Sequence, residues 1–350
     1  MHATTDHTPT RPADTPSPAT DPTTMRAVAQ RAYGPAEVLH VETIERPSVG
    51  DDEVLIEVEA AGLDRGVWHL MTGTPYLMRI MGFGLTKPKN PVLGMDVAGR
   101  VVEVGAAVTR FAVGDEVFGI GKGTFAEYAV AKEAKLAHKP DSVTFEQAAV
   151  STISGITALQ ALTKVGRLEA GQHVLVIGAS GGVGTFAVQL AKALGATVTG
   201  VASTAKLDTV RALGADHVID YTTQHIDDGD RRYDLIIDTG GRNPLPRLRR
   251  ALTPTGTLVI VGGEDGDRLT VGIGRQLRAA ILSPFVSRQR LTFFISTESL
   301  EFIEPLAAHL ADGTVTPTIG HRYDLDQVPP SIAAMEAGEV IGKAVIKVKP

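Results

Sequence analysis

A glycine-rich turn between an apolar run and a helical pattern is the segment whose chemistry can be read most directly. The run HVLVIG, beginning at His173, leads into Ala179, Ser180, Gly181, Gly182, Val183 and Gly184, followed by TFAVQLAKALG. In such a turn the helix amides face a pyrophosphate, Gly181 lets the backbone approach the phosphates, and Gly184 lets the helix pack on the strand. We therefore predict dinucleotide binding at this turn; a purely structural strand-to-helix turn is the alternative.

The end of the next apolar strand indicates which dinucleotide would bind. Sites for NAD usually carry an Asp or Glu about 20 residues after the turn, where it accepts from the adenosine ribose. Here the strand ends in VASTAK, and no acid follows before Asp208. Lys206, with the hydroxyls of Ser203 and Thr204, could bind a 2′-phosphate. We predict NADP(H), with NAD(H) less favoured; the alternative is that Lys206 is an ordinary solvated lysine at a helix start.

The residues that other kinds of catalytic or metal site require are largely missing from the sequence. The chain has no cysteine, which excludes disulfides, thiolate zinc sites and a cysteine nucleophile. Its ten histidines show no paired metal-ligand spacing, so we expect no protein-bound metal. No G-x-S-x-G elbow and no phosphate-binding P-loop is present. Paired carboxylates such as Asp51–Asp52 and Asp227–Asp228 lie in polar turns and are expected to be solvated.

The composition is that of an ordinary globular protein with room for two domains. The 350 residues carry a formal net charge of −6, and their basic residues are scattered, so we expect no nucleic-acid partner. We expect no membrane span. Residues 1–24 are rich in Pro and Thr without an apolar run, which predicts a disordered extension and no signal peptide; an expression or gene-start artefact is the alternative. With no cysteine, a cytoplasmic location is expected.

The hydrophobic period divides the chain into two kinds of structure. From Met25, short strands separated by turn signals predict a twisted antiparallel barrel or sheet. From about Ala148, apolar strands alternate with helices of about ten residues, which predicts a doubly wound parallel sheet with helices on both faces. After about Ser287 the pattern is mixed again. The fold class is therefore α/β, combined with a mostly β, barrel-like unit.

One long segment has no clear periodicity. The stretch from Gly73 to Asn90 mixes Gly and Pro with Tyr76, Leu77, Ile80 and Phe83. A loop of this length in a compact domain is usually functional or mobile. We expect it either to cover a substrate pocket or to pack at a subunit interface.

Several ordered motifs together resemble the medium-chain dehydrogenase/reductase superfamily over nearly everything from Met25 to the C-terminus. They are PVLGMDVAGRVVEVG, VGDEVFG, GTFAEYAV, SGITALQAL, GASGGVG, LGAD with HVIDY, and GKAVIKV. Within the superfamily, the chain is similar to the zinc-independent quinone oxidoreductase and zinc-less NAD(P)-dependent alcohol dehydrogenase-like branch. The resemblance implies a Rossmann domain at 148–287, inserted in a GroES-like catalytic domain formed by 25–147 and 288–350. It also implies an active site in the cleft between the two domains, and a homodimer formed by edge-strand pairing.

The positions that hold catalytic zinc in the zinc enzymes of the superfamily differ in this sequence. Asp64, Met95 and Ile153 occupy them, and the four-cysteine structural lobe is missing. A carboxylate, a thioether and an aliphatic chain cannot form a tetrahedral N/S zinc site. The branch usually has Asn at the position of Asp64, close to the nicotinamide, so the Asp is either a proton-handling group or a polar contact.

The same resemblance implies further cofactor contacts. It places Thr157 beside the nicotinamide ring and Thr239 and Gly262 against the cofactor. It surrounds the adenosine 2′-phosphate with Ser203, Lys206 and Tyr221. Without the resemblance, Tyr221 would be interpreted as an ordinary half-buried tyrosine at a strand end.

The reaction that fits these features is metal-free hydride transfer from NADPH to a quinone or an α,β-unsaturated carbonyl. Such acceptors spread the incoming charge over a conjugated oxygen, so Lewis-acid polarisation is less necessary. Asp64 and Tyr76 are the candidate proton donors, and solvent is the alternative. Two other functions stay open: metal-free reduction or oxidation of simple aldehydes, ketones or alcohols, and non-catalytic NADPH binding.

Overall fold

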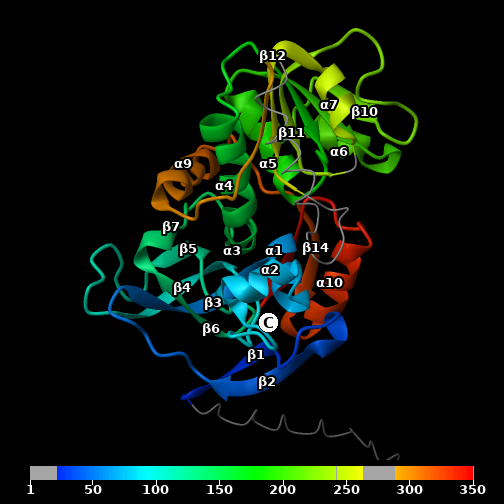
Figure 1. Cartoon of the computed structure of the whole chain (residues 1–350). Coiled ribbons are helices and arrows are strands. Elements are labelled where there is room, and N and C mark those ends of the chain that lie inside the picture. Colours follow the sequence, from blue (N-terminus) through cyan, green and yellow to red (C-terminus); the bar gives the residue numbers. More distant parts are fainter. Residues whose placement is uncertain (1–21, 242, 263–287, 350) are drawn as a thin grey trace, which may run out of the picture.

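The structure is a computed structural model that describes residues 22–241, 243–262 and 288–349. Two sheets dominate it (Figure 1): a parallel sheet in one half and a mostly antiparallel sheet in the other. The extension expected at 1–24 lies almost wholly outside the described residues, and so does the segment 263–287 of the expected nucleotide-binding domain.

The parallel sheet has six strands in the order β10-β9-β8-β11-β12-β13. Their apolar residues alternate between the two faces, so each strand is covered by helices on both sides. Val174 and Val176 of β8 enter the core that contains α4 and α5, whereas Leu175 and Ile177 enter the core that contains α7. The strands are β8 (His173–Ile177), β9 (Thr197–Ala202), β10 (His217–Asp220), β11 (Tyr233–Asp238), β12 (Leu252–Ile260) and β13 (Arg290–Phe293).

The helices of this half begin where the sequence supplies their signals. Helix α5 starts directly after the glycine turn, and its buried face includes Phe186 and Leu190. Helix α7 has Pro at its first turn, a position that tolerates a residue without an N–H. The helices are α4 (Thr152–Gln160), which continues as a π-helix to Val165, α5 (Gly182–Ala193), α6 (Leu207–Ala212), α7 (Leu245–Ala251) and α9 (Leu300–Ala311).

The other half is built on a sheet in the order β14-β15-β3-β4-β5-β7, with β6 paired to β3 and a separate β1–β2 ribbon. Its core contains Val54, Ile56 and Val58 of β3 together with Phe125 and Leu136. The strands are β1 (Thr24–Gln30), β2 (Leu39–Glu45), β3 (Glu53–Leu63), β4 (Asp96–Val104), β5 (Glu116–Ile120), β6 (Tyr128–Lys132), β7 (Leu136–His138), β14 (Ile319–Asp324) and β15 (Lys343–Lys347).

Short helices complete this half. Helix α3 (Phe145–Ala149) begins with a capping box formed by Thr144 and Gln147, and helix α10 (Val328–Glu336) packs beside β14 and β15. In Figure 1, α3 and α4 lie where the two halves meet, and the red C-terminal elements β14 and α10 lie at the right of the view. In the described parts of the chain, no helix combines the length and the apolar character needed to cross a membrane.

The predicted fold class is confirmed: an α/β parallel-sheet domain accompanies a mostly β, GroES-like domain. One boundary is different. Strand β13 pairs with β12, so the parallel sheet continues past the boundary expected between residues 287 and 288. Helix α9 also places Phe302, Ile303 and Leu306 in the core shared with α4 and α5. The sequence predicts a helix at SLEFIEPLAAHLADG, as found in α9, but it gives no sign of β13, because a four-residue strand is too short to show a period.

The segment from Gly73 to Asn90 folds into short helical turns. It follows α1 (Arg65–Thr72) and contains α2 (Tyr76–Met78) and a π-turn (Arg79–Phe83). Arg79 fixes the start of the segment by donating to the carbonyls of Gly73 and Thr72. Among the described side chains of this segment, Leu77, Ile80, Phe83 and Leu85 nevertheless stay exposed.

Candidate cofactor and active site

The glycine turn connects β8 to α5 as the sequence predicts. Gly178 takes a positive φ of 80°, which favours glycine, and the Gly181 amide donates to the Gly178 carbonyl over 3.0 Å. The amide of Ala179 donates to the Val201 carbonyl of β9, which ties the turn to the neighbouring strand. Ser180 is buried, and Val183 packs against the main core.

Space around the turn fits a pyrophosphate group. A Cβ on Gly184 would lie only 2.1 Å from the Gly178 carbonyl oxygen, so this glycine is required for the helix to start so close to the strand. A Cβ on Gly181 would have only that oxygen within 4 Å, at 3.3 Å, so its outer side is open. Gly181 is also the first residue before α5, where helix amides face outward and bind anions. The residues present therefore fit a dinucleotide.

Two more predicted cofactor residues lie against this turn. The Thr239 hydroxyl donates to the Ile177 carbonyl over 2.8 Å, and a Cβ on Gly178 would lie 2.4 Å from that hydroxyl oxygen. Gly262 follows β12, and a Cβ there would lie 2.6 Å from the Thr239 carbonyl oxygen. Both residues follow the carboxyl ends of parallel strands, where doubly wound folds bind their ligands.

The residues predicted to hold the adenosine phosphate lie at the ends of β9 and β10. Ser203 precedes the 3₁₀ turn Thr204–Lys206, and its carbonyl accepts from the Lys206 amide. Lys206 Nζ donates to the Gly338 carbonyl over 2.7 Å, although 132 residues separate the two. Tyr221 is 52% exposed, and its amide donates to Ala202. These residues therefore follow the carboxyl ends of two neighbouring strands, β9 and β10, which pair through Ala202 and Asp220.

An acid absent from the sequence argument adjoins this group. Asp220, the last residue of β10, accepts a hydrogen bond from the Thr204 hydroxyl. It also accepts from the amide and hydroxyl of Thr222. The Thr204 hydrogen bond, followed by those of Thr222, lowers the pKa of the Asp220 carboxyl, so it is ionised at neutral pH. The end of β9 supplies no acid before Asp208, whereas this carboxylate comes from the next strand of the sheet.

Thr157 lies on α4, one turn after the residues that face the glycine turn. Its hydroxyl donates to the Ile153 carbonyl over 2.6 Å. A Cβ on Gly182 would lie 3.2 Å from the Ser154 hydroxyl oxygen, which shows how closely α4 approaches the start of α5. The Ile153 amide in turn donates to Asp96 over 2.8 Å. Helix α4 therefore contacts both the cofactor turn and the antiparallel sheet.

Asp64 is the N-cap of α1. Its Oδ1 accepts from the Val67 amide over 3.2 Å, while its Oδ2 is buried and has no hydrogen-bond partner. The residue is only 7% exposed. A buried carboxylate oxygen without a partner costs free energy, and such atoms are common where a ligand completes the site. The structure thus places an unsatisfied acid at the end of β3.

A buried ion pair lies next to Asp64. Lys343 Nζ is 3.3 Å from Asp96 Oδ2, and both side chains are almost fully withdrawn from solvent. Burial, opposed by Lys343 and reinforced by the charge of Asp64, raises the pKa of Asp96 to about 7. The sequence motifs included both residues, but no local signal assigned them a role, because they are 247 positions apart.

The donor set at the three positions named for zinc does not fit that metal. Asp64 caps a helix, Ile153 contributes a backbone amide, and the Met95 methyl lies 2.8 Å from where a Cβ on Gly66 would stand. One carboxylate, one thioether and one aliphatic chain do not supply the N and S ligands that zinc requires. Among the described residues, no three His, Cys, Asp or Glu side chains are grouped to hold a metal ion.

Tyr76, the second proton-donor candidate, is in a different environment from Asp64. It is 38% exposed on the apolar segment, and its ring lies 4.6 Å from the Arg79 guanidinium carbon. Arg79 also lies over the ring of Tyr33. Tyr76 therefore belongs to the segment beside α1, whereas Asp64 belongs to the buried cluster.

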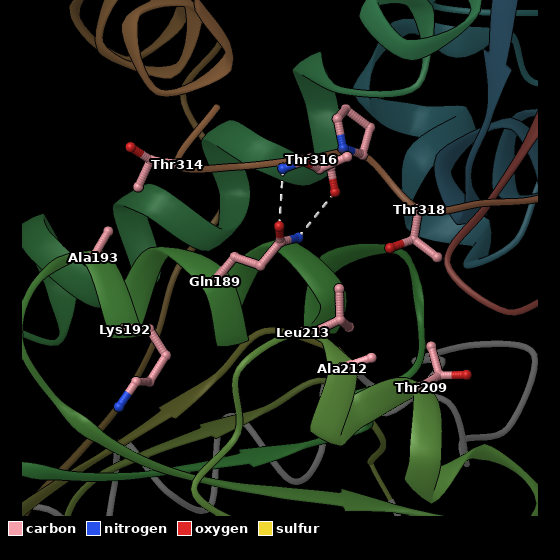
Figure 2. A pocket seen from close by; sticks show the side chains of 10 residues that line it. Gln189, Lys192, Ala193, Thr209, Ala212, Leu213, Thr314, Thr316 and Thr318 are labelled. Carbon is pink, nitrogen blue, oxygen red and sulfur yellow. Dashed lines mark hydrogen bonds between the residues drawn. The ribbon is translucent and has the colours of Figure 1, made fainter. Parts of the chain in front are cut away.

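A surface groove of about 530 Å³ lies elsewhere on the parallel-sheet domain (Figure 2). Gln189 of α5 crosses it and forms hydrogen bonds with the amide and carbonyl of Thr316. Its walls are Gln189, Lys192, Ala193, Thr209, Ala212, Leu213, Thr314, Thr316, Pro317 and Thr318. The groove borders the C-terminal half of α5 and is separate from the glycine turn at the other end of that helix.

Comparison with known proteins agrees with this geometry. The family model described as alcohol dehydrogenase GroES-like domain matches residues 50–141, and the one described as zinc-binding dehydrogenase matches residues 213–346. The chain is 31% identical to a 2-methylene-furan-3-one reductase of Solanum lycopersicum, over 95% of this chain and 82% of the relative. It is 32% identical to a chloroplastic quinone-oxidoreductase of Triphysaria versicolor, over 92% of this chain and 98% of the relative.

A mycobacterial protein solved in complex with NADPH has a similar structure. The TM-score is 0.78 at 27% sequence identity, over 93% of this chain and 100% of that one. The resemblance seen in the sequence motifs is therefore confirmed, and so is an activity that uses a nicotinamide cofactor. The chain belongs to the medium-chain dehydrogenase/reductase family and is an NAD(P)H-dependent oxidoreductase.

Proposed function

We propose that this protein uses NADPH to reduce a quinone or an α,β-unsaturated carbonyl without a catalytic zinc ion. The observation that carries the proposal is the donor set at Asp64, Met95 and Ile153, which cannot polarise a carbonyl through zinc. An enone or quinone needs that polarisation least, because conjugation disperses the charge of an added hydride. The names of the two relatives, a furanone reductase and a quinone-oxidoreductase, support the same acceptor class.

The cofactor preference is part of the proposal. When bound, NADPH supplies the hydride. Gly181 leaves open space for the pyrophosphate, and the amides at the start of α5 face it. Lys206 and Tyr221 flank the strand ends where the adenosine phosphate would lie. Lys206 is the only one of these residues that brings a positive charge, so it supplies the attraction for a 2′-phosphate.

Asp64 is the residue we propose to handle the proton that the reduction consumes. Its Oδ2 is buried without a partner, so a protonated Asp64 has a free O–H to donate. Replacement by Asn keeps the size and the helix cap but removes the acid. We expect Asp64→Asn to lower kcat at least tenfold, because general acid catalysis contributes about 10²–10⁴-fold. Unchanged turnover and an unchanged pH profile would leave the role to solvent or to Tyr76.

The deciding experiment is an acceptor panel. NADPH consumption, with NADH in parallel and a chelator present, is measured against ortho- and para-quinones, enones and simple aldehydes. Turnover of the conjugated acceptors despite the chelator supports the proposal. Turnover of simple aldehydes alone would indicate a general carbonyl reductase. NADPH binding without consumption of any acceptor would indicate a non-catalytic protein.

We also propose that the protein is a homodimer that pairs through the edge of the parallel sheet. The family resemblance supports this assembly, and β13 is the outermost described strand at one end of the sheet. Gel filtration with light scattering gives the mass directly. A monomeric mass near 36.9 kDa would rule out the homodimer.

A further inference from the structure

Asp64, Asp96 and Lys343 stand at neighbouring strand ends of one sheet. Strand β3 lies between β15 and β4, and Asp96 is directly opposite Gly62, two residues before Asp64. Lys343 begins β15, next to the residue that pairs with Leu63. Asp96 is fully buried, Lys343 is 2% exposed and Asp64 is 7% exposed. The three charged side chains are therefore held together away from water.

Charge balance decides how many protons this cluster holds. Two ionised carboxylates and one ammonium would leave a buried net charge of −1. Burial strongly disfavours such an excess, and it is relieved when the two acids share one proton. The raised pKa of Asp96 has the same cause, since burial and the charge of Asp64 both oppose its ionisation.

The cluster also contacts the cofactor turn. The Gly342 amide, directly before Lys343, donates to the Ser180 carbonyl over 2.8 Å. The Lys343 side chain runs beside Gly182, where a Cβ would lie 3.1 Å from its Cδ. Asp96 receives the Ile153 amide from α4, so elements of both domains hold the pair. Its geometry is thus fixed relative to the nucleotide-binding turn.

We propose that Asp96 and Lys343 are positioning residues that act through Asp64: the buried pair keeps one proton on the two carboxylates near neutral pH, so that Asp64 can donate it to the reduced acceptor. This inference rests on the proposed function. Neither positioning residue needs to touch the acceptor.

The proton step balances as follows. Hydride addition, with oxidation of the nicotinamide, leaves the acceptor with an extra electron pair and a negative charge. The O–H bond of Asp64 breaks, and a bond from that proton to the acceptor forms. Asp64 is left as a carboxylate, and water restores its proton before the next turnover. Lys343 compensates the negative charge during the interval.

Two charge-removing variants should move the pH profile in opposite directions. In Asp96→Asn the cluster keeps one carboxylate, Asp64, and one ammonium, so the carboxylate ionises more readily and the limb where kcat/KM falls with rising pH moves down by about one pH unit. In Lys343→Met two carboxylates share the site without a cation, so the same limb moves up by about one unit. A purely structural role lowers the activity without shifting the limb, and that result would overturn the proposal.

Control variants make the test independent of folding yield. Lys343→Arg keeps the cation and should keep the wild-type limb. Lys349→Met removes an exposed lysine that pairs with Glu57 and Glu59 after the same strand, and it should also leave the limb in place. The position of a limb does not depend on how much enzyme is folded. If Lys343→Met yields no folded protein, Asp96→Asn and Lys343→Arg decide the question.

A measurement without turnover separates this inference from the proposed function. Carbon-13 NMR of aspartate carboxyl carbons in the whole protein follows ionisation directly. We expect one carboxyl resonance titrating near neutral pH in the wild type, which Asp96→Asn shifts to lower pH or removes. If no acceptor is reduced but this titration is found, the proposed function fails while the shared proton stands. If acceptors are reduced and no carboxyl titrates near neutrality, the inference fails alone.

Discussion

Lys343 Nζ lies 3.3 Å from Asp96 Oδ2, and this contact joins the last strand of the chain to the strand that begins at Asp96. Strand β3 lies between those two strands, so the pair bridges across it, next to Asp64. Because the pair is buried, we expect its ionisation to affect the stability of the fold.

The unfolding free energy should depend on pH through Asp96. Its folded pKa, about 7, is raised above the unfolded value, so its stabilising contribution is complete below the ordinary pKa of 3.8 and is lost progressively as the pH rises from there to 7. Each pKa unit corresponds to about 1.4 kcal/mol, which limits the effect to about 4 kcal/mol. Asp96→Asn removes this dependence. In urea unfolding, the unfolding free energy of Asp96→Asn relative to that of the wild type should therefore increase between pH 5 and pH 8.

A difference in unfolding free energy between Asp96→Asn and the wild type that stays constant over that pH range would contradict the prediction. Asp216→Asn is the matched control, because Lys192 and the Val198 amide hold that carboxylate at the surface of the other domain. Desolvation opposes these contacts, but the pKa of Asp216 is lowered, so its contribution is present above its unfolded pKa and is lost only in acid. The stability of Asp216→Asn relative to the wild type should therefore not increase between pH 5 and pH 8.

Two glycines of the turn should separate folding from cofactor binding. Gly184→Ala puts a Cβ 2.1 Å from the Gly178 carbonyl oxygen, so we expect a strongly destabilised protein. Gly181→Ala meets that oxygen at 3.3 Å, a tight contact that a shift of a few tenths of an ångström relieves, so the fold should be disturbed far less. Its methyl group would occupy the space for the pyrophosphate, and NADPH affinity should fall at least tenfold. Thermal unfolding and NADPH fluorescence titration measure the two effects. Normal NADPH affinity in folded Gly181→Ala would move the phosphate site away from this turn.

The preference for NADPH over NADH should change in opposite directions when Lys206 and Asp220 are replaced. Lys206→Ala removes the positive charge and should weaken NADPH binding about tenfold or more, with little change for NADH. Asp220→Asn removes a negative charge beside Thr204 and should leave NADPH binding equal or stronger. Parallel titrations with both cofactors give the ratio. Equal weakening of NADPH and NADH in Lys206→Ala would mean that Lys206 only supports the structure through its bond to Gly338.

Local patterns were enough to predict the parts of the site that are contiguous in sequence. The glycine turn and the alternation of strands and helices both depend on residues within about fifteen positions of each other, and the structure reproduces them. Contacts between distant segments left no such pattern. The Asp96–Lys343 pair spans 247 positions, and the Asp220 carboxylate reaches Thr204 from another strand. The β13 boundary was missed for a different reason, because four residues cannot establish a period.

The exposed apolar segment after α1 should contribute to acceptor binding. Ile80 is 72% exposed there, together with Leu77, Phe83 and Leu85, and Arg79 anchors the segment to the end of α1. Of the two roles that the sequence left open, covering an acceptor pocket accounts for its position directly after the helix that Asp64 caps. We expect Ile80→Ser to raise KM for apolar acceptors several-fold, while kcat and the native mass stay unchanged.

The matched control is Val113→Ser, which removes a similarly exposed apolar side chain from a turn of the antiparallel domain. It should change neither KM nor the mass. Steady-state kinetics with one apolar and one polar acceptor, combined with light scattering, distinguish the two roles. A reduced mass of Ile80→Ser with an unchanged KM would show that the segment is a subunit interface, since exposed apolar side chains of this kind also serve association.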